Sequence, residues 1–92
     1  MKSYFDIIEE NPEVDLSGEE YKLICKGVEL GFEDKRALMI ELERSISTIN
    51  SNLAKLAKKK YLRKRKVRTT NNRPKFEYSL ADKAIEVLGI EL

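Results

Sequence analysis

The stretch 37–62, ALMIELERSISTINSNLAKLAKKKYL, contains the pattern that decides the fold. Asp34 is the predicted N-cap of a short helix over about residues 35–42. After a two-residue turn, Ser45 is the predicted N-cap of a second helix over about residues 46–60. Apolar residues recur every three or four positions, so each helix has one buried face. The predicted inward side chains are Leu38, Leu42, Ile46, Ile49, Leu53 and Leu56.

Beyond the second helix, the pattern changes from helical to extended. β-forming residues on both sides of the turn sequence 70–74 predict a two-stranded hairpin over about residues 62–79. The alternation of Phe76, Tyr78 and Leu80 predicts that one face of the second strand covers the core.

A short helix is predicted at the N-terminus. Ser3 is its N-cap, and Asn11-Pro12 ends it because proline disfavours the α conformation in the residue before it. The predicted apolar face consists of Met1, Tyr4, Phe5 and Ile8. A helix this short needs a packing partner, which is either the domain body or a second subunit.

The next helix begins at a capping box formed by Ser17 and Glu20, and Gly31 is placed to end it. Its predicted buried stripe is Tyr21, Ile24, Cys25 and Val28. Gly27 lies in mid-helix, where glycine costs about 1 kcal/mol relative to alanine. This position predicts close contact with another helix.

A last helix is predicted to start within residues 79–82. Its inward side chains are Ala81, Ala84, Ile85 and Leu88. The full order is four helices, a hairpin and one helix in a single domain of 92 residues. The expected fold class is mainly α with a small β-hairpin.

The net charge of +2 conceals a strong segregation of charge along the chain. Residues 1–45 hold twelve acidic and six basic side chains, whereas residues 46–75 hold eleven basic side chains and no acidic one. Residues 76–92 hold four acidic side chains and one basic one. This distribution indicates a polyanionic partner, with a solvated basic surface as the alternative.

The stretch 37–62 resembles the helix-turn-helix of MarR-type and ArsR-like winged-helix regulators. The shared features are Leu38 and Leu42, Ser45-Ile46-Ser47-Thr48-Ile49, Leu53 and Leu56, and Lys58-Lys59-Lys60. Glu43 and Lys60 stand where such proteins often have glycine. The likeness continues more loosely from Leu16 to Leu88. It implies a winged helix-turn-helix, with the helix-turn-helix at about 34–60, the wing at about 62–79, and short N-terminal and C-terminal helices flanking them.

The resemblance implies binding of double-stranded DNA by a small homodimeric transcription regulator. The 46–60 helix would enter the major groove, where base edges are distinguishable. Its candidate base and phosphate contacts are Ser47, Thr48, Asn50, Ser51, Lys55 and Lys58. Among the first four, Asn50 alone can make a bidentate contact to adenine.

The wing is expected to add contacts to phosphates and to the minor groove. The candidates are Arg63, Lys64, Arg65, Lys66, Arg68, Asn71, Asn72, Arg73 and Lys75. Two sets have alternative explanations. Asn71-Asn72 also suits left-handed backbone at a turn, and Lys58-Lys59-Lys60 also suits a helix C-terminus.

Several kinds of chemistry are not expected. The chain has no histidine and one cysteine, so no ordinary zinc site, metal or cofactor is predicted, and no enzyme activity. Cys25 is interpreted as a small buried hydrophobe. Neither a signal peptide nor a membrane span is expected, and the single cysteine favours a cytoplasmic location. A small-molecule effector is neither indicated nor identified by the residues.

Two other functions remain open at this stage. One is a replication, partition or packaging accessory of a plasmid, virus or phage, which small size and modest base-reading chemistry favour. The other is a winged helix used for protein contact, in which the wing meets an acidic surface.

Overall fold

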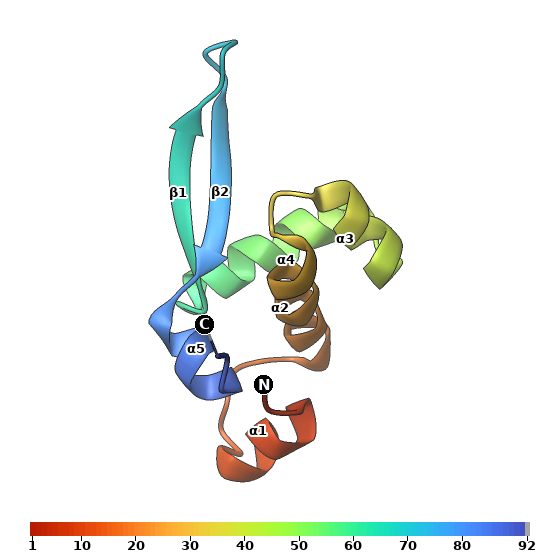
Figure 1. Ribbon diagram of the computed structural model, residues 1–92, viewed down its shortest axis with the longest axis vertical. Coiled ribbons are helices and arrows are strands. Elements are labelled where there is room, and N and C mark those ends of the chain that lie inside the picture. Colours follow the sequence, from red (N-terminus) through yellow and green to blue (C-terminus); the bar gives the residue numbers. More distant parts are fainter. Residues whose placement is uncertain (92) are drawn as a thin grey trace.

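The computed structural model describes residues 1–91, which form five helices and one two-stranded antiparallel hairpin (Figure 1). The helices are α1 (Tyr4–Glu10), α2 (Gly18–Leu30), α3 (Lys35–Leu42), α4 (Ile46–Lys58) and α5 (Asp82–Leu88). The strands are β1 (Leu62–Arg68) and β2 (Pro74–Leu80). This order is the predicted one, and it is compatible with a winged helix-turn-helix layout.

Four helices begin at their predicted N-caps, because capping is a local interaction that the sequence displays directly. The side chains of Ser3, Ser17, Asp34 and Ser45 each accept a hydrogen bond from the backbone N–H three residues further on. At α2 the capping box is complete, since the Ser17 N–H also donates to Glu20 Oε1 at 3.0 Å.

One core joins the helices to the base of the hairpin. In α4, buried side chains recur every three or four residues, and Tyr61 continues the core from α4 into β1. The largest fully buried side chains are Tyr61, Ile7, Leu23, Ile24, Leu38, Ile49, Leu53, Leu56 and Leu88.

In α4 and β2, two side chains that were predicted to be buried are exposed. Ile46 is 40% exposed in the first turn of α4, and Phe76 is 42% exposed far along β2. Leu42, Tyr78 and Leu80 do pack against the core, although each is only partly buried. The two predictions were wrong because periodicity identifies the inner face of an element but not how far the core extends along it.

The predicted apolar face of α1 was wrong for three of its four residues, and Tyr4 is the exception. Met1, Phe5 and Ile8 are exposed, and Ile7 is the buried side chain of this helix. The Tyr4 hydroxyl donates to a backbone carbonyl in the following loop at 2.7 Å. α1 therefore packs on the domain body through its Tyr4 and Ile7 side.

The buried stripe of α2 differs in part from the prediction. It consists of Leu23, Ile24 and Gly27, with Tyr21 and Cys25 partly buried and Val28 exposed. The close contact predicted at Gly27 is present, but its partner is the Phe32 ring rather than another helix. A Cβ atom at Gly27 would lie 2.0 Å from Phe32 Cε1, so glycine makes room for this ring.

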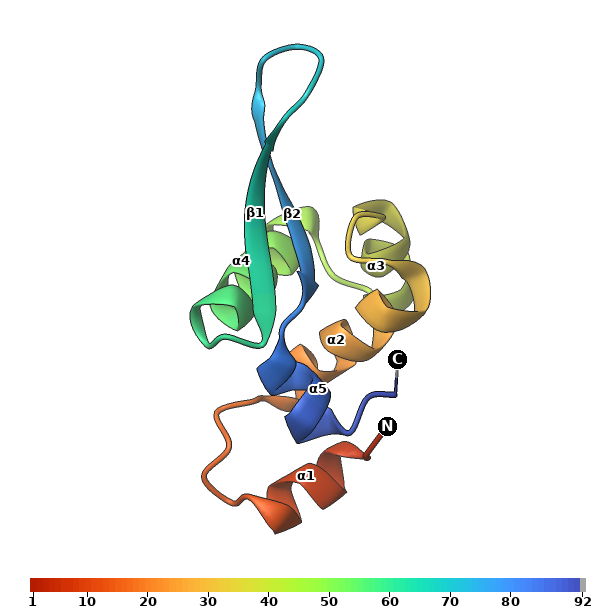
Figure 2. The ribbon, with the colours of Figure 1, turned by 60° about the vertical axis from the view of Figure 1, so that its left-hand side comes forward.

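The hairpin covers residues 62–80, close to the predicted span of about 62–79. Its pairing runs from Leu62 opposite Leu80 at the base to Arg68 opposite Pro74 near the tip. The molecule measures 46 Å along its longest axis. The hairpin projects from the helices at one end of that axis, and α1 lies at the other end (Figures 1 and 2).

α5 closes the core beneath the hairpin. Ala84 and Leu88 are buried, and Ile85 and Ala81 are partly buried, as predicted for its inward side. The Lys2 N–H donates to the Leu88 carbonyl at 2.7 Å, so the N-terminus lies against the end of α5.

Candidate nucleic-acid interface

The hairpin presents its basic residues on two distinct faces. Residues opposite each other in an antiparallel pair lie on the same face, and faces alternate along a strand. The register therefore places Lys64, Lys66 and Arg68 on the same face as Tyr78, Phe76 and Pro74. It places Arg63, Arg65 and Val67 on the other face with Ser79, Glu77 and Lys75.

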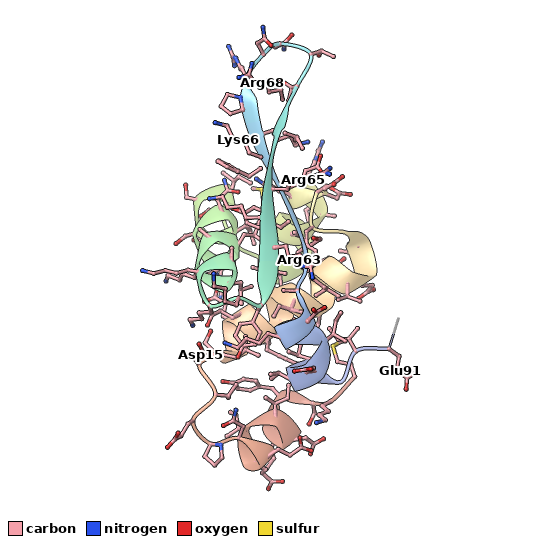
Figure 3. The ribbon with its side chains drawn as sticks, turned by 90° about the vertical axis from the view of Figure 1, so that its left-hand side faces the viewer. Asp15, Arg63, Arg65, Lys66, Arg68 and Glu91 are labelled. Carbon is pink, nitrogen blue, oxygen red and sulfur yellow. The ribbon has the colours of Figure 1, made fainter. Side chains whose placement is uncertain are left out.

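Acidic partners occur on one of these faces. The Arg63 guanidinium lies 3.6 Å from a carboxylate oxygen of Asp82, and the Arg65 guanidinium lies 3.2 Å from a carboxylate oxygen of Glu77. Figure 3 shows Arg63 and Arg65 on one side of the hairpin and Lys66 on the other. We call the side of Arg63 and Arg65 the paired face. The opposite side, with Lys64, Lys66 and Arg68, is the open face, because no carboxylate among residues 1–91 lies within ion-pairing distance of these three cations.

Phe76 contacts a lysine side chain on the open face. The Lys64 ammonium lies over the Phe76 ring, 4.1 Å from its centroid. A cation–π contact of this kind holds the lysine against the strand while its charge still faces solvent.

The outer face of α4 is polar and lined by short side chains. The exposed residues of this helix are Ile46, Ser47, Asn50, Ser51, Ala54, Lys55 and Lys58. Thr48 differs from the prediction because it is partly buried, and its Oγ1 lies 3.1 Å from Ser45 Oγ at the start of the helix. Of the fifteen residues predicted to contact DNA, Thr48 is the one that is not fully exposed.

A groove joins the end of α4 to the base of the hairpin. Its volume is about 540 Å³, and its lining residues are Ala57, Lys60, Leu62, Arg63, Lys64, Ala81 and Asp82. Lys60 was not among the predicted contacts, although its place at the end of the lysine run is the sequence signal that could have identified it. The groove places Lys60, which follows α4, beside Arg63 and Lys64 of the hairpin.

Lys59 faces the opposite way from its basic neighbours. Its ammonium donates to Glu20 Oε1 at 2.7 Å and to the Asp15 carbonyl at 2.6 Å. The Glu20 side chain is only 5% exposed and that of Lys59 is 32% exposed, so the carboxylate is the buried partner of this ion pair. Lys59 therefore ties the end of α4 to the start of α2.

Asp15 extends this network to the base of the hairpin, where Figure 3 shows it. The Tyr61 hydroxyl donates to Asp15 Oδ1 at 2.7 Å, and Lys83 lies 3.6 Å from the same oxygen. Lys83 also lies over the Tyr61 ring, 4.4 Å from its centroid. These contacts fix the first residues of β1 relative to α2 and α5.

The network lowers the pKa of both carboxyl groups. The hydrogen bond from Tyr61 lowers the pKa of Asp15 most, burial opposes it, and the Lys83 charge lowers it further. Burial raises the pKa of Glu20, but hydrogen bonds from Lys59 and Ser17 outweigh burial, so this pKa is also below its usual value. Burial and the Asp15 hydrogen bond raise the pKa of Tyr61.

These pKa shifts predict the direction of acid sensitivity. A carboxyl group with a depressed folded-state pKa stabilises the fold above its unfolded pKa, and this contribution disappears as pH falls through the folded-state value. We expect the urea midpoint to stay level from pH 7 to about 5 and to fall below about pH 4. Circular dichroism across this range measures it. In E20Q the midpoint should be lower at pH 7 and change less with acid; an acid profile identical to wild type would contradict the assignment.

Three residues other than glycine have left-handed backbone at turns. Glu43, between α3 and α4, has φ 53°, and Lys60, between α4 and β1, has φ 74°. Glycine adopts positive φ most readily, so both turns have a backbone conformation that would suit glycine. At the hairpin tip, Asn72 has φ 57°. Left-handed backbone was one of the two explanations for the Asn71-Asn72 sequence, and it does occur at Asn72.

Known proteins supply no assignment for this surface. Comparison of the chain with protein-family models, curated proteins and solved structures finds no match. Within residues 1–91, no helix combines the length and apolar character needed to cross a membrane. In the same range, no three His, Cys, Asp or Glu side chains gather where they could hold a metal ion.

Proposed function

We propose that this protein is a winged helix-turn-helix that binds double-stranded DNA. In this proposal α4 is the recognition helix in the major groove, and the β1–β2 hairpin is the wing. The proposal is supported above all by one observation: eight of the eleven cations in residues 46–75 have no acidic partner among residues 1–91. These eight are Lys55, Lys58, Lys60, Lys64, Lys66, Arg68, Arg73 and Lys75.

The geometry of α4 supports its placement in the groove. A major groove about 12 Å wide admits one α-helix. The short side chains of Ser47, Ser51 and Ala54 let the helix backbone approach the base edges closely. Lys55 and Lys58 further along would neutralise phosphates at the groove edge.

The hairpin would contact the sugar–phosphate backbone of the DNA next to the part of the major groove that α4 occupies. The open face would meet phosphates with Lys64, Lys66 and Arg68, whose charge no acid offsets. On the paired face, Arg63 and Arg65 would have to give up Asp82 and Glu77 to reach DNA. We therefore assign the larger share of wing binding to the open face.

Salt dependence tests this proposal directly. Each neutralised phosphate contributes about −0.9 to the slope of log Kobs against log salt concentration. If six to eight of the unpaired cations engage, the slope for a mixed-sequence duplex should lie between about −5 and −7. Fluorescence anisotropy over a salt series measures it. A slope near zero, or equal binding to an unrelated polyanion such as heparin, would contradict the proposal.

The pattern of DNA protection in a footprint would distinguish two biological roles, a transcription regulator and an accessory DNA-binding protein. A homodimeric regulator would protect two half-sites about one helical turn, or a multiple of it, apart in a footprint. The exposed face of α4 offers one amide and no guanidinium, which favours the alternative of an accessory protein that binds DNA with modest sequence preference. Such a protein would give extended, cooperative protection.

A further inference from the structure

Ile46 is an apolar side chain that is not buried in the core. It is 40% exposed in the first turn of α4, although its spacing from Ile49 and Leu53 is typical of a buried position. Ser45 alone begins the helix, since its side chain accepts the Thr48 N–H, so Ile46 is not required for capping.

Ile46 lies on the flank of α4 that faces the hairpin. Residues 46, 50 and 57 share one side of a helix, because they are separated by four and by seven positions. Ala57 lines the groove beneath β1, so Ile46 and Asn50 continue that side toward the start of the helix. Ile46 and Asn50 are therefore exposed on the flank of α4 that meets the base of the hairpin at Ala57.

Asn50 has its full hydrogen-bonding capacity available. Its side chain is exposed, and it forms no hydrogen bond with any of residues 1–91. The amide nitrogen of asparagine can donate to N7 of adenine while its amide oxygen accepts from the N6 amino group, which makes a bidentate contact. The preferred partner of an apolar side chain in the major groove is the C5 methyl of thymine.

We infer that Ile46 and Asn50 together read A·T base pairs, an inference that rests on the proposed DNA binding. Asn50 contacts adenine, and Ile46 packs against the methyl group of a thymine one or two steps away. The spacing fits, because four helical residues rise about 6 Å and adjacent base pairs are separated by about 3.4 Å. The exposed face of α4 has no arginine for guanine, and its two lysines, Lys55 and Lys58, lie more than one helical turn beyond Asn50.

The test removes each contacted atom from the DNA. The probes are an alternating dA–dT duplex, an alternating dA–dU duplex that lacks the thymine methyl groups, and a dA–dT duplex in which 7-deazaadenine replaces adenine. Wild-type protein should bind the uracil duplex about fourfold more weakly, as expected for losing one buried methyl group. It should bind the deazaadenine duplex at least about fivefold more weakly.

Variants show which side chain reads which atom. I46A should lose its preference for thymine over uracil and keep its sensitivity to deazaadenine, and N50A should do the reverse. I40A is the matched control, because Ile40 is 67% exposed on α3 and should leave both preferences intact. Thermal melts by circular dichroism establish that each variant is folded.

The outcomes separate this inference from the proposed function. Steep salt-dependent binding with no loss on either modified duplex would overturn the A·T reading while the proposed function stands. A thymine preference that persists in I46A would overturn the role of Ile46. Weak binding to all three duplexes with little salt dependence would overturn both.

Discussion

The variant K66A/R68A/R73A is expected to bind duplex DNA on the order of 10²-fold more weakly than wild type near 0.1 M salt. Lys66 and Arg68 belong to the open face of the hairpin, Arg73 lies at the tip, and none of them has an acidic partner among residues 1–91. Three lost phosphate contacts should also reduce the magnitude of the salt slope by about three. Anisotropy titrations at several salt concentrations give both quantities.

The control removes the same net charge elsewhere. K2A/K22A/K26A also takes three positive charges from the protein, but from the N-terminal segment and α2. Its affinity should fall far less, and its salt slope should match that of wild type. Equal losses in the two variants would mean that net charge alone, rather than the hairpin surface, determines binding.

The paired face provides a second comparison within the hairpin. R63A/R65A removes two cations that already lie beside Asp82 and Glu77. We expect a smaller loss per residue than on the open face, because each arginine must first leave its carboxylate.

The neighbouring variants K58A and K59A are expected to give opposite phenotypes. K59A removes the ammonium from Glu20, whose Oε2 already has no hydrogen-bond partner among residues 1–91. Leaving this carboxylate buried should lower the free energy of unfolding by about 3 kcal/mol, with the folded fraction still binding DNA. K58A should change stability by less than about 0.5 kcal/mol while weakening binding and reducing the salt slope by about one.

Urea denaturation and anisotropy together distinguish the two effects. The double variant E20Q/K59M removes both charges and should recover part of the stability lost in K59A, because no unpaired ion remains. Unchanged stability in K59A, or an unchanged salt slope in K58A, would contradict the division of this lysine run into one structural and one binding residue.

The sequence predicted best those features that depend on near neighbours in the chain. N-caps such as Ser17 and Ser45 lie three residues from their partners, and the hydrogen bonds form as expected.

Features that depend on distant segments could not be predicted in this way. The lysine run gives no sign that Lys59 alone turns toward Glu20, thirty-nine residues earlier in the chain. The strand register decides that Arg65 meets Glu77, and hence that the basic residues divide into two faces. The extent of the core along each element left Ile46 and Phe5 exposed against expectation.

The candidate site itself was largely predictable, because it depends on surface composition more than on packing. The eleven basic and no acidic side chains of residues 46–75 identified the elements, and fourteen of the fifteen chosen side chains are exposed. The strength of each contribution was not predictable, since it depends on which cations already have a carboxylate beside them.

The opposed positions of α1 and the hairpin along the 46 Å axis give the molecule a large electric dipole. The acidic residues Asp6, Glu9 and Glu10 lie on α1, and the cationic strands β1 and β2 lie at the opposite end of the molecule. In the field of a polyanion, the two ends experience forces of opposite sign, and the resulting torque turns the hairpin forward before contact. Productive collisions should therefore be more frequent than for a protein with its charge spread evenly, and added salt should slow association by weakening this alignment.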